Sequence, residues 1–211
     1  MKKVYIFDVD GTLIDSMGEW KKVIPSLLEE RGIAYPNDLV KRVVALGLPG
    51  VAKYLTEQFP LELSVQEVLS YFTQRFQQKY AEEITEKPGV KETLTALKAR
   101  GAILCTLTAG SHTLFDACLK RLGLWELFDF CWSTEDFPVS KADPTIYKLV
   151  ADRLGVSIED CLMVDDSLSA LNSAVESGVY TVGVYDEFSK ENEKEIRNKV
   201  NRYLYRLEEL L

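Results

Sequence analysis

The first apolar segment of the chain leads directly into two carboxylates, in the stretch Val4-Tyr5-Ile6-Phe7-Asp8-Val9-Asp10-Gly11-Thr12-Leu13. Its apolar part predicts a buried strand, along which side chains alternate, so Asp8 and Asp10 project to the same side. Gly11 then allows the backbone to turn sharply beside them. Because two like charges held close together repel, a hard cation such as Mg2+ would fit between them. The alternative is a strand end at which two aspartates only cap a turn, and this stretch alone leaves both interpretations open.

Three later segments carry polar or charged residues beyond strand-like runs. They are Leu107-Thr108-Ala109-Gly110-Ser111, Ser140-Lys141-Ala142-Asp143-Pro144 and Val164-Asp165-Asp166-Ser167. With Asp8-Val9-Asp10-Gly11-Thr12, and in this order, they resemble the four signatures of the haloacid dehalogenase superfamily of phosphate-transferring enzymes. The resemblance spans nearly the whole chain. Within the superfamily, the chain resembles the phosphoglycolate phosphatase and beta-phosphoglucomutase group, whose members carry a helical cap.

After the first strand, the hydrophobic pattern is helical as far as about Glu83. Apolar residues recur at helical spacing in two series, Trp20, Val23, Ile24, Leu27 and Leu28, and then Val65, Val68, Leu69, Phe72 and Phe76. Breaks at 32–36, at 47–50 and at Pro60 divide this block into about four helices. We therefore expect an inserted helical cap domain of residues 15–84, while residues 1–14 and 85–211 form the core domain.

From about residue 88 onward, the pattern alternates between helices and strands. Strands are predicted at 102–107, 128–132, 161–165 and 179–184, with helices between them. This alternation predicts an α/β fold, a doubly wound parallel sheet with a Rossmann-like core. The resemblance implies that the first strand is central, between the strands that precede Thr108 and Asp165. We expect a charged amphipathic helix over 187–211, with Ile196, Val200, Leu204 and Leu207 packed against the core.

The resemblance assigns chemical roles to the acidic residues. Asp8 is the expected nucleophile, which forms an aspartyl-phosphate, and Asp10 is the expected general acid and base. The Asp8 carboxylate, the backbone carbonyl of Asp10 and Asp166 are expected to hold Mg2+. Asp165 is expected to lie behind them, although its position next to Asp166 leaves open which of the two binds the metal directly.

The remaining signatures are expected to bind the phosphate group. Thr108 would donate its hydroxyl to a phosphate oxygen, and the amides of Ala109 and Gly110 would form an anion site before the next helix. Lys141 resembles the superfamily's lysine that neutralises the phosphate and the nucleophile. Because open parallel sheets bind ligands at the carboxyl edge of their strands, we expect these distant segments to converge there. His112, the only histidine, is expected on the first turn of the next helix, without a role in proton transfer.

The second aspartate of the first signature, Asp10, favours phosphate chemistry, because haloacid dehalogenases proper lack it. We expect a phosphatase that acts on a small phosphate monoester. The mutases of this group commonly carry a histidine where this chain has Trp20, and that histidine helps a sugar hydroxyl accept the phosphoryl group, so its replacement favours a phosphatase. A beta-phosphoglucomutase-like enzyme is the alternative, and a non-catalytic phosphate-binding regulator is a weaker one. Trp20, together with Met17 and a loop at 47–50, is expected to line the substrate side of the cap.

Composition points to a small-molecule enzyme. The formal net charge of -8 and the pI near 4.9 disfavour nucleic acid as a partner and leave a small phosphorylated metabolite as the expected one. Asp8 interrupts the first apolar run before it reaches the length of a signal peptide, and no segment approaches the ~20 apolar residues of a membrane span. Four scattered cysteines favour reduced thiols. We expect a cytoplasmic monomer or small homo-oligomer without membrane contact.

Overall fold

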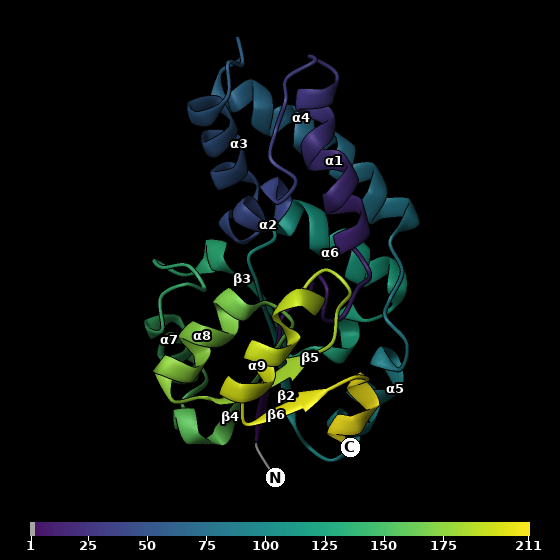
Figure 1. Ribbon diagram of the computed structural model, residues 1–211. Coiled ribbons are helices and arrows are strands. Elements are labelled where there is room, and N and C mark those ends of the chain that lie inside the picture. The colour runs from purple at the N-terminus through teal and green to yellow at the C-terminus, as the bar shows by residue number, and fades with distance from the viewer. Residues whose placement is uncertain (1–2) are drawn as a thin grey trace.

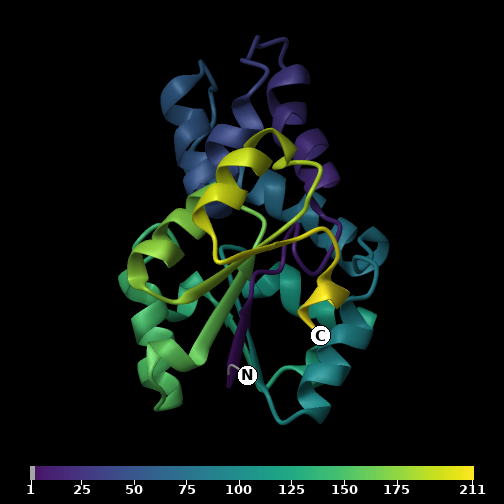
Figure 2. The ribbon, with the colours of Figure 1, turned by 60° about the horizontal axis from the view of Figure 1, so that its bottom comes forward.

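The structure is a computed structural model that describes residues 3–211, apart from the side chain of Ala45. In these residues, six parallel strands form one sheet, in the order β3-β2-β1-β4-β5-β6. Figure 2 shows the sheet between helices on its two sides. The strands are β1 (Val4–Phe7), β2 (Ile103–Thr108), β3 (Phe130–Ser133), β4 (Cys161–Asp165), β5 (Tyr180–Val184) and β6 (Arg202–Leu204). The predicted α/β fold is confirmed, as is the central position of β1 between β2 and β4.

Helices cover both faces of the sheet because successive strand residues point to opposite sides. Tyr5 and Phe7 belong to one hydrophobic core, together with buried residues of α5 (Val90–Ala99) and α6 (His112–Leu122). Val4 and Ile6 belong to a second core, together with buried residues of α7 (Thr145–Leu154) and α8 (Leu168–Ser177). Short helical turns complete the connections around the sheet: η3 (Trp125–Leu127), η4 (Thr134–Asp136) and η5 (Ile158–Asp160).

Residues 15–84 form a helical block at one end of the molecule, beyond the carboxyl end of β1 (Figure 1). The block contains α1 (Met17–Glu29), α2 (Leu39–Val43), the short turn η1 (Val44–Leu46), α3 (Gly47–Gln58), α4 (Val65–Gln78) and a π-helical turn, η2 (Lys79–Glu83). α4 begins with a capping box, in which the Ser64 hydroxyl accepts a hydrogen bond from the Glu67 amide at 3.2 Å and the Glu67 carboxylate accepts one from the Ser64 amide at 2.8 Å.

The two chain segments that connect the block to the sheet pair with each other. Asp15 donates its amide hydrogen to the Thr85 carbonyl at 2.9 Å, and Lys87 donates to the Leu13 carbonyl at 2.9 Å. Ile14 and Glu86 form an antiparallel bridge between these two bonds. The chain therefore leaves the sheet and returns to it at the same place.

The predicted helix over 187–211 is wrong for most of its length. The segment forms η6 (Lys190–Asn192), α9 (Glu193–Lys199), β6 and η7 (Leu207–Leu210). β6 pairs with the edge of β5, and this long-range pairing outweighs a weak helical pattern. A Cβ on Gly183 would lie 2.7 Å from the Ile196 side chain and 2.9 Å from Tyr203, so glycine permits the close approach. The expected loop at 47–50 is instead the first turn of α3.

The described helices include none that is both long and apolar enough to cross a membrane. Among the described residues, no disulfide joins the cysteines, and three of the four are buried.

The packing of side chains in the core of the helical block leads to a prediction about stability. Phe72 is fully buried on α4, whereas Val65 on the same helix is 42% exposed. Phe72→Ala is expected to lower the free energy of unfolding by about 3–5 kcal/mol, because it leaves a cavity. Val65→Ala, the matched control, should change it by less than about 0.5 kcal/mol. Urea unfolding followed by circular dichroism measures both, and equal effects would contradict the packing described here.

Candidate active site

The end of β1 and the end of β4 approach each other closely, which brings their carboxylates together. Gly11 adopts a φ of 82°, and a Cβ at this position would lie 2.8 Å from both carboxylate oxygens of Asp166. Only glycine allows both the turn and this contact. Thr12, one residue later, donates its hydroxyl to Asp166 Oδ1 at 3.2 Å.

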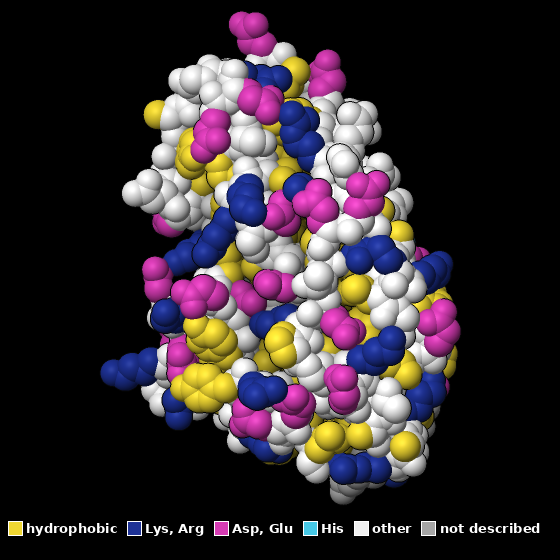
Figure 3. Space-filling model, turned by 90° about the vertical axis from the view of Figure 1, so that its right-hand side faces the viewer, with side chains coloured by type: hydrophobic (Ala, Val, Ile, Leu, Met, Phe, Trp, Pro, Cys, Tyr) yellow, Lys and Arg dark blue, Asp and Glu magenta, His cyan; other side chains and the backbone are white. Residues whose placement is uncertain are grey.

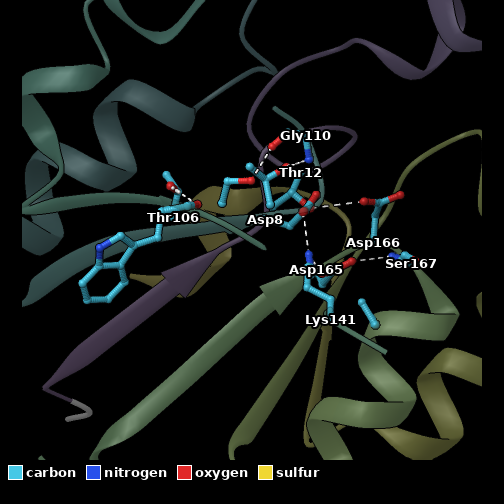
Figure 4. Close-up of polar contacts among 12 residues, drawn as sticks. Asp8, Thr12, Thr106, Gly110, Lys141, Asp165, Asp166 and Ser167 are labelled. Atoms are coloured by element: carbon cyan, nitrogen blue, oxygen red, sulfur yellow. Dashed lines mark hydrogen bonds and ion pairs between the residues drawn. The ribbon is translucent and has the colours of Figure 1, made fainter. Parts of the chain in front are cut away.

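Lys141 lies between two carboxylates from different strands. Its Nζ is 2.6 Å from Asp8 Oδ1 and 2.5 Å from Asp165 Oδ2, and all three side chains are buried (Figure 4). Burial alone would lower the pKa of Lys141, but the charges of Asp165 and Asp8 raise it overall, so the amine remains protonated. Asp165 is also held by the Ser167 amide, which donates to its Oδ1 at 2.8 Å.

Asp8, Asp165 and Asp166 form a cluster whose ligand oxygens lie within 4.8 Å of one another. Burial raises the pKa of Asp166 well above its usual value, and the neighbouring charges of Asp165 and Asp8 raise it further. Burial likewise raises the pKa of Asp8, opposed by Lys141. Three buried carboxylates with one ammonium leave excess negative charge, and hard oxygen donors suit a divalent cation. The residues present therefore fit a metal site.

The contacts of the two adjacent aspartates differ. Both oxygens of Asp165 accept short hydrogen bonds, from Lys141 and from the Ser167 amide. The oxygens of Asp166 accept only longer bonds from hydroxyl groups, at 3.2 Å from Thr12 and 3.4 Å from Ser189. The carboxylate of Asp166 is therefore less constrained by hydrogen bonds than that of Asp165.

Asp10 follows β1 as well, but its carboxylate lies in a different network. Its Oδ1 accepts hydrogen bonds from the Ser16 hydroxyl at 2.6 Å and from the Tyr80 hydroxyl. Burial raises the pKa of Asp10, and these two donors oppose the effect. Asp10 therefore has hydroxyl partners, whereas Asp8 has a cationic partner.

The turn after β2 contains Thr108, Ala109 and Gly110, the residues that the sequence suggested for binding an anion. Thr108 ends β2 and is buried, and its Oγ1 accepts a hydrogen bond from the Gly110 amide at 3.0 Å. Ser133 at the end of β3 donates its hydroxyl to the Gly110 carbonyl at 2.6 Å, which fixes the turn. α6 begins two residues later at His112. The ring nitrogens of His112 lie 3.0 Å from Asp116 and 2.9 Å from Asp136.

One cavity of about 400 Å³ brings all the predicted site residues together. Those from the sheet and its loops are Asp8, Asp10, Thr108, Ala109, Gly110, Lys141, Asp165 and Asp166, and Trp20 is the one from the helical block. Met17 also lines the cavity, as expected, whereas of the expected segment 47–50 the lining includes Gly47 alone. Lys41 of α2, which the sequence did not single out, lines it as well.

Sequence reasoning missed several residues that support this site. Lys87 donates to the Gly11 carbonyl at 2.6 Å, to the Tyr185 carbonyl at 2.8 Å and to Asp186 at 2.9 Å, and so fixes the turn after β1. Ser16 and Tyr80 contact Asp10. Thr12 belongs to the first signature and could have been noted. Tyr80 and Lys87 carry no local signal, because their partners are distant in the sequence.

The family and the fold of this chain agree with those of known proteins. The family model for haloacid dehalogenase-like hydrolases matches residues 2–178. The chain is 29% identical over 178 residues to "phosphorylated carbohydrates phosphatase" of Thermotoga maritima, covering 82% of this chain and 81% of the relative. It is 24% identical over 175 residues to "6-phosphogluconate phosphatase" of Escherichia coli, covering 82% and 78%.

Among solved structures, CbbY from Rhodobacter sphaeroides in complex with phosphate has the same fold, with a TM-score of 0.83 and 24% identity. The similarity covers 100% of this chain and 96% of CbbY. The match to the family model, across most of the sheet and all four signatures, identifies the family. The chain belongs to the haloacid dehalogenase-like hydrolases.

Proposed function

We propose that this hydrolase is a Mg2+-dependent phosphatase that cleaves a small phosphate monoester through an aspartyl-phosphate intermediate. The observation that carries the proposal is the buried group of Asp8, Lys141 and Asp166 in one cavity with the turn at Thr108–Gly110. In this arrangement Asp8 can act as the nucleophile, Lys141 supplies a cationic group, and the turn supplies groups that can form hydrogen bonds with a phosphate. Relatives named as phosphatases support the same reaction.

In the proposed reaction, a carboxylate oxygen of Asp8 attacks phosphorus, and the bond between phosphorus and the leaving oxygen breaks. Asp10 gives its proton to the leaving oxygen and then takes a proton from the attacking water, which releases phosphate and restores Asp8. Lys141 neutralises charge on Asp8 and the phosphate while Asp165 holds its ammonium in place. His112 is not needed for proton transfer, because both its ring nitrogens are already hydrogen-bonded to carboxylates.

Asp8, the Asp10 carbonyl and Asp166 would hold Mg2+, and Asp165 would support the site through Lys141. The bound ion would reduce the repulsion between the Asp8 carboxylate and the phosphate. Thr108 would donate to a phosphate oxygen, as would the amides of Ala109 and Gly110. The Gly110 amide would then exchange its bond with Thr108 Oγ1 for one with the phosphate.

The substrate is proposed to be a small metabolite held under the helical block, with residues 15–84 as a cap domain on a core of 1–14 and 85–211. The cavity of about 400 Å³ has Met17 and Trp20 on its cap side and suits a small ester. Acidic and basic side chains are interspersed on the face in Figure 3, which does not favour a polyanion as a partner. A cytoplasmic monomer or small homo-oligomer remains our prediction.

A mutase is the alternative, and the contacts of Trp20 weigh against it. Its indole N–H donates to the Tyr80 hydroxyl at 3.0 Å, so it is not available to a sugar hydroxyl. A purely phosphate-binding role is less favoured still, because Asp8, Asp10, Lys141 and Asp166 are all present.

Metal binding can be measured without turnover. At a Mg2+ concentration of about 100 times Kd, the melting temperature is expected to rise by about 5–10 °C. Asp166→Asn should abolish most of this rise. In metal-free buffer the same variant should melt above the wild type, because it removes one of three buried carboxylates that repel one another. Differential scanning calorimetry measures both effects.

The control for this measurement is Asp152→Asn, which alters an exposed carboxylate on α7 and should respond to Mg2+ as the wild type does. An undiminished rise in Asp166→Asn would contradict the proposed ligand set.

Turnover is tested with a panel of small phosphate esters, with and without Mg2+. Phosphate release is expected to require the metal and to fall by at least about 10³-fold in Asp8→Asn, because the nucleophile is lost. The panel includes beta-glucose 1-phosphate with a glucose 6-phosphate readout. Formation of glucose 6-phosphate without free phosphate would favour the mutase, and full activity of Asp8→Asn would exclude the proposed mechanism.

A further inference from the structure

A chain of buried hydrogen bonds runs from the helical block to Asp10. The Trp20 indole on α1 lies 3.0 Å from the Tyr80 hydroxyl, and that hydroxyl contacts Asp10 Oδ1. Trp20 and Tyr80 are 3% and 1% exposed, so water does not compete for these bonds. Tyr80 lies 60 residues after Trp20 and 70 after Asp10, so the fold brings its hydroxyl to them.

The direction of this chain is fixed by the chemistry of its members. Indole nitrogen can only donate, so the Tyr80 oxygen accepts from Trp20 and its own hydrogen is directed to Asp10. The Ser16 hydroxyl donates to the same carboxylate oxygen at 2.6 Å. Asp10 Oδ1 thus accepts hydrogen bonds from two converging hydroxyl groups.

The other oxygen of Asp10 faces the proposed phosphate site. A Cβ on Gly110 would lie 3.2 Å from Asp10 Oδ2 and 3.3 Å from Thr108 Oγ1, so Oδ2 is adjacent to the turn that is proposed to bind phosphate. When the carboxyl group is protonated, its hydrogen belongs on Oδ2, because both hydroxyl donors occupy Oδ1.

The backbone around Tyr80 is held from a second direction. Tyr80 lies in the π-helical turn η2, and such turns are frequent at functional sites. Arg121 of α6 donates to the Tyr80 carbonyl at 3.1 Å and also to the Ile84 carbonyl. The ring of Tyr80 packs edge-on against Phe76, with centroids 6.1 Å apart. Both the backbone and the ring are therefore fixed where the hydroxyl meets Asp10.

We propose that Tyr80, oriented by Trp20 and assisted by Ser16, is a positioning residue that keeps the Asp10 carboxyl turned with Oδ2 toward the leaving oxygen. The proposal rests on the phosphatase function above. As the phosphorus–oxygen bond breaks, the hydrogen on Oδ2 passes to the leaving alkoxide, and Asp10 is left as a carboxylate. The network thereby enables cleavage of alkyl esters, whose leaving groups need a proton.

The test compares two esters that differ in this need. The leaving group of a sugar phosphate is a basic alkoxide. The leaving group of p-nitrophenyl phosphate is a stable phenolate, which requires little protonation. Tyr80→Phe keeps the ring and removes the hydroxyl. This variant is expected to lower kcat/KM for the sugar phosphate by about 10–100-fold, which is part of the 10²–10⁴-fold that a general acid contributes. It is expected to lower kcat/KM for p-nitrophenyl phosphate by a much smaller factor.

Three further variants complete the experiment. Asp10→Asn should give the largest difference between the losses of kcat/KM for the two esters. Trp20→Phe should give a smaller difference, again with the greater loss for the sugar phosphate. Tyr71→Phe is the matched control, because the Tyr71 hydroxyl on α4 bonds to Ser26 and Glu30 instead of Asp10, and both esters should react as with the wild type.

The outcomes separate the two proposals. If Tyr80→Phe lowers kcat/KM for both esters by the same factor, or for neither ester, the positioning role is overturned while the phosphatase function stands. If the wild type hydrolyses neither ester, or does so equally well after Asp8→Asn, the proposed function fails, and the positioning role fails with it.

Discussion

The ion pairs of Lys141 are the interaction on which the rest of the site depends. One ammonium bridges the end of β1 and the end of β4, at 2.6 Å from Asp8 and 2.5 Å from Asp165. Without it, buried carboxylates of two adjacent strands would face each other uncompensated, at a cost of several kcal/mol per ion. A single lysine still leaves a negative excess once Asp166 is counted. That excess makes the site receptive to a cation, and so the pairing that stabilises the fold also prepares the chemistry.

Much of the site could be predicted from the sequence because parallel sheets gather ligand-binding residues at one edge. Asp8, Thr108 and Asp165 each end or follow a strand that the hydrophobic pattern predicts, and the family resemblance implies which strands are neighbours. Lys141 was found only through its resemblance to a known signature, since an isolated lysine before a helix is usually solvated. The contacts of Asp165 and Asp166 then distinguish two residues that the sequence treats alike.

Other features could not be predicted because their causes are not local. The segment 187–211 has a helical pattern, but β5 offers an unpaired edge, and the backbone hydrogen bonds of β6 satisfy it. Tyr80 follows Phe76 at helical spacing and looks like an ordinary core residue in the sequence. Its hydroxyl reaches Asp10 only because the turn η2 and Arg121 hold it there. A pattern of apolar residues predicts burial, but it does not predict which polar atom a buried side chain will meet.

The antiparallel bridge between Ile14 and Glu86 has a consequence for how such a protein can change over time. The helical block begins and ends beside this isolated bridge, whose two backbone segments lie about 5 Å apart. Its length is therefore independent of the geometry of the sheet, and segments of other sizes can be accommodated at this point without strain in β1. The sheet and its carboxylates can be inherited unchanged while the inserted segment is exchanged, lengthened or shortened. Under the function proposed above, catalytic chemistry and substrate choice can thus diverge separately within one chain.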